Sequence, residues 1–117
     1  MNDNSGPSSF NLGALQAWAK EILAGLEHPP LGMAAALAEE CGEVATCLLD
    51  HHAYGKPLER DLLGDELVDV LVCLLEIASH HGIDLEVAAD RKLRDIAKKA
   101  PEWRELLAEA LKKSRGV

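Results

Sequence analysis

Apolar residues along this chain recur at intervals of three and four positions, which is the spacing of one face of an α-helix. These segments predict a first helix from about residue 10 to 26, further helices over about 30–52, 58–81 and 85–99, and a fifth helix that opens at Pro101. The expected N-cap of the first helix is Ser8 or Ser9, and Gly82 is expected to end the third. No segment alternates between apolar and polar residues as a strand would. We therefore predict an all-α fold, with a loose tail over residues 1–9 and one helical domain over residues 10–117.

The third predicted helix is apolar nearly all round, and such a helix is normally buried. At about 100° per residue, it carries one apolar stripe of Leu67, Leu71, Leu74 and Ala78 and a second of Val68, Val72 and Leu75. One small chain covers both stripes poorly, whereas a second copy would cover them well. We therefore expect a homodimer in which Val68, Val72 and Leu75 are buried against the partner subunit.

Acidic residues interrupt two of these apolar helices in pairs. Glu40 and Glu43 lie three residues apart, and so do Glu66 and Asp69. Residues at this spacing project from the same helix face. Two such helices packed together would direct four carboxylates at one point, and a hard divalent cation is the usual reason for such a set of oxygens.

A solvated acidic face is the simpler explanation of most acidic pairs on helices. Here, however, Asp69 lies within an almost wholly apolar run, where an isolated carboxylate would be costly or would remain protonated. Like charges at this spacing also destabilise a helix by a few tenths of a kcal/mol. A shared metal ion removes both penalties, so we favour the metal site over the solvated face.

The composition of the chain disfavours several classes of protein, among them nucleic-acid-binding and membrane-spanning proteins. The formal net charge of −8 disfavours a grip on the backbone of DNA or RNA, but it allows small nucleotides because a bound cation can invert the local field. No apolar run is long enough to span a membrane, and no signal peptide is recognisable. Cys41, Cys47 and Cys73 lie in helical apolar sequence without a Cys-x-x-Cys motif. Free thiols of this kind favour a cytoplasmic protein.

The two acidic motifs, taken in order, resemble a known family. Leu-Ala-Glu39-Glu40-Cys-Gly-Glu43-Val and then Gly-Asp65-Glu66-Leu-Val-Asp69-Val-Leu are similar to the Glu-Glu-x-x-Glu and Glu-x-x-Asp signature of MazG-like nucleoside triphosphate pyrophosphohydrolases. This superfamily includes dimeric dUTPases, dCTPases and phosphoribosyl-ATP pyrophosphohydrolases. The resemblance covers residues from about Leu12 to Pro101, and it implies a four- to five-helix bundle that is completed by dimerisation or by a pair of dimers.

The resemblance also implies an activity and roles for single residues. It implies Mg²⁺-dependent cleavage of a nucleoside triphosphate to the monophosphate and pyrophosphate in a housecleaning role, with Mn²⁺ as a substitute. Glu40, Glu43, Glu66 and Asp69 would be the metal ligands. Glu39 is our own candidate for the base that activates water; the alternative is that it takes no part in the reaction or only supports a neighbouring ligand. Lys92 matches a lysine of the family and would contact phosphate, while Gln16 would read a base edge; ordinary solvated side chains are the alternative for both.

Two positions depart from the family pattern. Many relatives carry Asn four residues after the lysine and Tyr before the proline, where this chain has Ile96 and Ala100. Because these positions help to hold nucleotide in relatives, the preferred base and sugar do not follow from the resemblance. Two alternatives stay open: a phosphoribosyl-ATP pyrophosphohydrolase, and an inactive helical dimer that binds nucleotide or a partner.

Overall fold

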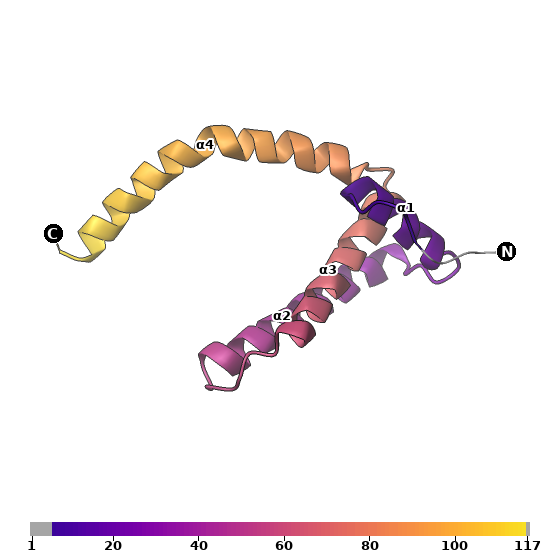
Figure 1. Ribbon diagram of the computed structural model, residues 1–117, viewed down its shortest axis with the longest axis horizontal. Coiled ribbons are helices and arrows are strands. Elements are labelled where there is room, and N and C mark those ends of the chain that lie inside the picture. Colours follow the sequence, from indigo (N-terminus) through magenta and orange to yellow (C-terminus); the bar gives the residue numbers. More distant parts are fainter. Residues whose placement is uncertain (1–5, 117) are drawn as a thin grey trace. The chain divides into compact units, whose positions relative to one another are not determined.

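Four α-helices make up the described part of the chain, residues 6–116 of a computed structural model (Figure 1). They are α1 (Leu12–Ile22), α2 (Pro30–His52), α3 (Arg60–His80) and α4 (Leu85–Ser114). No strand occurs within these residues, so the predicted all-α class is confirmed. Residues 1–5 of the predicted tail lie outside the described residues.

The described residues form two compact units, one that ends at Leu85 and one that begins at Glu86. The first unit contains α1, α2 and α3 and the second contains nearly all of α4. Each unit is described by itself below. The single domain expected over residues 10–117 stays a prediction.

Helix α1 is shorter than its apolar pattern predicted. Its N-cap is Asn11, whose side-chain oxygen accepts a hydrogen bond of 2.8 Å from the backbone N–H of Ala14. The prediction that Ser8 or Ser9 caps this helix is therefore wrong, because Asn is an equally good cap and lies nearer the first apolar residue. The helix ends at Ile22, and Gly25 then takes a positive φ of 83° in the turn that follows.

Helices α2 and α3 run side by side in opposite directions, joined by a turn at one end of the pair (Figure 1). Helix α2 has the predicted bounds; Pro30 occupies its first turn, where the missing N–H costs nothing. Helix α3 begins at Arg60, slightly later than predicted, with Asp61 in its first turn and His80 in its last. Both charges suit the helix dipole when the histidine is protonated.

The core of this unit lies where α1 and the start of α2 pack on the second half of α3. Met33, Cys73, Leu75 and Ala78 are the buried apolar residues there. The first half of α3 is not covered by other helices of this unit on one side, which leaves Leu67 and Val68 about half exposed. We call it the open half of α3. Leu75 is only 3 % exposed within its own chain, so the prediction that it is buried against a partner subunit is wrong.

The end of α3 was predicted correctly at Gly82. Its φ of 65° is left-handed, a conformation that favours glycine. The N–H of Gly82 donates to the carbonyl of Ser79, and that of Ile83 donates to Ala78 over 2.8 Å. These two bonds form a Schellman motif, which satisfies the last carbonyls of the helix and turns the chain away from it.

Helix α4 is continuous from Leu85 to Ser114 and passes through Pro101. The prediction of a separate fifth helix that opens at Pro101 is therefore wrong: a proline inside a helix bends it without always ending it. Trp103, Leu106, Leu107 and Leu111 are exposed in its second half. Among the helices described, none is both long and apolar enough to cross a membrane.

Candidate metal centre and adjoining cavity

Three of the four predicted metal ligands meet between α2 and α3. One carboxylate oxygen from each of Glu40, Glu66 and Asp69 lies within 4.8 Å of the other two. Oxygens bound to one divalent ion at about 2.0–2.6 Å lie no more than about 5 Å apart. The spacing therefore allows a single ion to contact all three carboxylates, and the donor set of oxygens alone suits Mg²⁺ or Mn²⁺.

The helices explain this convergence. Glu66 and Asp69 are three residues apart on α3, so both project from the face that also carries the buried Cys73. Glu40 comes from α2, two turns after Met33, the buried residue of that helix, and α2 packs against α3. The packing of apolar residues thus places carboxylates from two helices at one level of the pair.

Burial raises the pKa of Glu40 above its ordinary value, and neighbouring carboxylates raise it further. In decreasing order of effect, these neighbours are Asp69, Glu66, Glu39 and Glu43. The pKa of Glu66 is also raised, first by burial and then by Glu43, Asp69 and Asp65. Carboxyl groups whose pKa is raised in this way lose their protons less readily. A divalent cation bound among them would favour the ionised carboxylates and reduce their repulsion.

The fourth predicted ligand, Glu43, does not belong to this group of converging oxygens, although it is near enough to raise the pKa of both Glu40 and Glu66. It is exposed, as is Glu39, the predicted base. Glu39 adjoins Glu40 on α2, and its charge also raises the pKa of Glu40. The ligand role of Glu43 and the catalytic role of Glu39 stay predictions.

The two predicted substrate-binding residues have different surroundings. Lys92 is exposed on α4, in the second unit. Gln16 is committed to contacts within the first unit: its Nε2 donates to the carbonyl of Ile83 over 2.7 Å, and its Oε1 accepts from the N–H of Leu85 over 2.9 Å. Reading a base edge with Gln16 would break these bonds, so its geometry favours a structural role, while the substrate-binding role stays a prediction.

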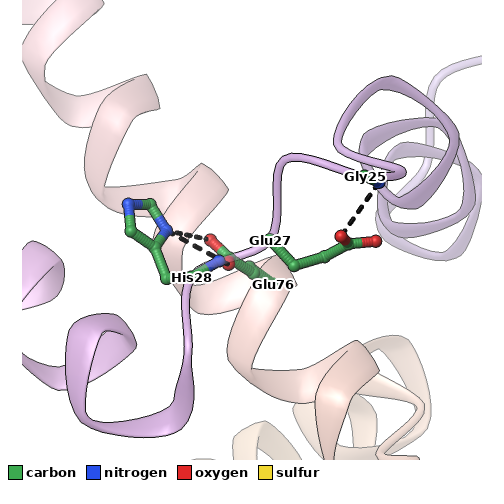
Figure 2. A network of polar contacts seen from close by, with 4 residues as sticks. All are labelled: Gly25, Glu27, His28 and Glu76. Carbon is green, nitrogen blue, oxygen red and sulfur yellow. Dashed lines mark hydrogen bonds and ion pairs between the residues drawn. The ribbon is translucent and has the colours of Figure 1, made fainter.

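Sequence reasoning missed Glu76, a buried carboxylate two turns after Asp69 on the same face of α3. Its side chain is 7 % exposed. Figure 2 shows its carboxylate turned toward His28. Glu76 Oε1 accepts a hydrogen bond of 2.7 Å from the backbone N–H of His28, and Nδ1 of the His28 ring lies 3.1 Å from both carboxylate oxygens. Nδ1 must carry a proton to donate to them. The signal was present, because Asp69 and Glu76 share the seven-residue spacing of one helix face.

This pair lines a cavity of about 570 Å³, a volume within the range of small-molecule sites. The walls come from the end of α1, the connection to α2, the start of α2 and the last turns of α3. Six of the residues that line it are Lys20, Leu23, His28, Met33, Glu76 and His80.

Cys73 lies between the carboxylate group and this cavity. Its thiol is buried, and burial raises its pKa, as do the nearby charges of Glu40, Glu76 and Asp69. The thiol of Cys73 is therefore near enough to be affected both by Glu40 and Asp69 of the carboxylate group and by Glu76 of the cavity. All three cysteines are free.

Comparison with known proteins identifies the family. The model of the MazG nucleotide pyrophosphohydrolase domain matches residues 28–103, which is more than half of the chain and includes both acidic motifs. The chain belongs to the MazG nucleotide pyrophosphohydrolase family, as its sequence motifs predicted. Neither a curated protein nor a solved structure matches it.

Proposed function

We propose that this protein is a Mg²⁺-dependent nucleoside triphosphate pyrophosphohydrolase with a housecleaning role. It would cleave the bond between the α and β phosphates and release a monophosphate and pyrophosphate. The observation that carries the proposal is the convergence of Glu40, Glu66 and Asp69 within 4.8 Å, in a chain of the MazG family.

The residues present fit a hard divalent ion. Three carboxylates at one level of the helix pair supply negative charge, and the raised pKa of Glu40 and of Glu66 reflects first burial and then the charges of neighbouring carboxylates. Bound there, Mg²⁺ would neutralise triphosphate charge and orient the reacting bond. Glu43, which lies close to the group, would join as a further ligand or hold its water shell.

The chain's own side chains would carry the proton transfer and part of the binding. Glu39 would accept the proton of the attacking water, since it adjoins the metal-binding carboxylates and is exposed to solvent. Lys92 would contact a phosphate of the substrate as a flexible point charge. Substrate would be a free nucleotide and not a nucleic-acid polymer, because the net charge of −8 repels a long phosphate backbone.

A homodimer or a pair of dimers would complete the enzyme. Val68 is 53 % exposed on the first half of α3 and the adjacent Leu67 is 51 % exposed, and a second copy would cover both residues. The three free thiols favour a cytoplasmic location.

Pyrophosphate release from a panel of ribo- and deoxynucleoside triphosphates, with and without Mg²⁺ or Mn²⁺, tests the proposal. We expect release that depends on the metal. Asp69→Asn should weaken Mg²⁺ binding, measured by calorimetry, more than Glu43→Gln does, because only Asp69 belongs to the converging group. The exposed Glu21 of α1 provides a matched control as Glu21→Gln. A wild type that cleaves no nucleotide with either metal would overturn the proposed function.

A further inference from the structure

We infer that the cavity beside Glu76 receives the base of the nucleotide, and that the Glu76 carboxylate selects bases that present an amino group to it. This inference rests on the proposed function, and it names the substrate class of the same site. Three observations support it: the position of the cavity, its polar lining and the remaining acceptor capacity of Glu76.

The position follows from the register of α2 and α3. Asp69 and Glu76 are seven residues apart on one face of α3, which is two turns or about 10 Å along the axis. Met33 and Glu40 are separated by the same interval on α2, and Met33 lines the cavity. The carboxylate group that would bind the phosphates through a metal ion and the cavity thus lie at successive levels of the same helix pair. A nucleotide carries its phosphates and its base at opposite sides of the ribose, so a single molecule can place one at each level.

The lining suits a flat heterocycle with polar edges. Leu23, Met33 and two prolines supply apolar surface, and the polar groups are those of Glu76 and His28 together with Lys20, Glu27, Ser79 and His80. Most ligand sites combine these features: an apolar pocket that holds the ring and a few fixed polar groups that choose among rings. Glu76 is fixed, because the backbone and the ring of His28 both hold its carboxylate.

Acceptor capacity sets the chemical preference. A carboxylate offers about four lone-pair directions, and the described contacts use those that face the N–H and Nδ1 of His28. The remaining direction accepts a hydrogen bond from an amino group and repels a carbonyl oxygen. Cytosine differs from uracil by a 4-amino group in place of a 4-oxo group, and guanine differs from hypoxanthine only by its 2-amino group. The Glu76 carboxylate therefore favours CTP over UTP, or GTP over ITP.

The first experiment compares hydrolysis within these matched pairs. We expect wild type to prefer the amino-bearing member of its better-cleaved pair by on the order of 10- to 100-fold in kcat/KM, the scale of one hydrogen bond to a charged group. Glu76→Gln should reduce that ratio to within about threefold, because the side-chain amide can accept a hydrogen bond from an amino group or donate one to a carbonyl oxygen. Glu21→Gln should leave the ratio unchanged. Equal use of both members by wild type, or an unchanged ratio in Glu76→Gln, would overturn the inference.

Binding separates this inference from the proposed function. The α,β-methylene analogues of CTP, UTP, GTP and ITP resist cleavage, so their dissociation constants with Mg²⁺ report recognition alone. An amino preference in binding that Glu76→Gln removes supports the inference even if no nucleotide is cleaved; equal binding within both pairs overturns it even if cleavage occurs. Should Glu76→Gln fail to fold, His80→Trp fills the cavity from an exposed position. It should weaken all four analogues at least tenfold while Mg²⁺ binding persists, and unchanged affinities would overturn the inference.

Discussion

Gln16 of α1 donates a 2.7 Å hydrogen bond to the backbone carbonyl of Ile83, although 67 residues separate them in the sequence. Its other amide atom accepts from the N–H of Leu85, the first residue of α4. One side chain thus satisfies two backbone groups in the segment that links α3 to α4. Both groups would otherwise need water or another partner.

Gln16→Ala should therefore destabilise the protein by about 1–3 kcal/mol, the cost of leaving backbone polar groups unsatisfied. Urea denaturation measures this change, and faster amide exchange at Leu85 should accompany it. Glu21→Ala, on the exposed side of the same helix, should change stability by less than about 0.5 kcal/mol. Equal stabilities of the two variants would contradict the structural role of Gln16.

Stability without metal should depend on pH through Glu40 and Glu66. Both have a raised pKa in the folded protein, so the folded state binds more protons than the unfolded state over that interval. Stability must then fall as pH rises from the ordinary glutamate pKa of about 4.3 through the raised values. Glu40→Gln removes a charge from this group and should raise Tm at neutral pH in the presence of chelator.

The same Tm difference should vanish below about pH 4, where wild-type Glu40 is already protonated. Saturating Mg²⁺ should reverse the order at neutral pH, because only a protein that binds the ion gains stability from it. A Glu40→Gln variant that is less stable than wild type in chelator at neutral pH would contradict the electrostatic account of the group.

Glu39→Gln tests the assignment of the base. The amide keeps the size of the side chain but cannot accept a proton, so turnover should fall by about 10²–10⁴-fold. Mg²⁺ binding should change little, because Glu39 does not belong to the converging carboxylates. Single-turnover kinetics with saturating nucleotide separate this loss from a loss of binding. Full turnover in the variant would leave the metal centre intact and move the base to another residue.

Association should respond to a charge on the open half of α3. Val68→Glu places a carboxylate at a position that is 53 % exposed in one chain, so the folded monomer tolerates it while a covered interface does not. We expect sedimentation to show a dimer for wild type and a folded monomer for the variant. Leu75→Glu is the contrasting case, because it buries a charge in the core and should unfold the chain. A monomeric wild type at micromolar concentration would refute the homodimer.

Much of the fold follows from periodicity. The pattern gave the bounds of α2 correctly, and it placed the end of α3 at Gly82 because only glycine takes that left-handed turn cheaply. It failed at Pro101, where helix continuity depends on neighbouring turns and not on the proline alone. It also failed at Leu75, because a helical pattern shows which residues share a face but not which neighbour covers it.

Part of the candidate site could also be predicted from the sequence, and part could not. Spacing within one helix paired Glu66 with Asp69, and the apolar context brought Glu40 to the same point, as the structure shows. Glu43 shares the spacing but lies outside the group, since the spacing within one helix does not specify where a second helix packs against it. The contact of Glu76 with His28 joins residues 48 positions apart, and no local pattern encodes such a contact.

Pro101 leaves a gap in the hydrogen-bond ladder of α4. Proline has no N–H, so the carbonyl of Ala97, four residues earlier, lacks its usual helical donor. Water can reach that carbonyl, and the turn around it can open without breaking the helix on either side. A bending force on α4 would therefore be taken up first in the turn around Ala97, where one rung of the hydrogen-bond ladder is missing.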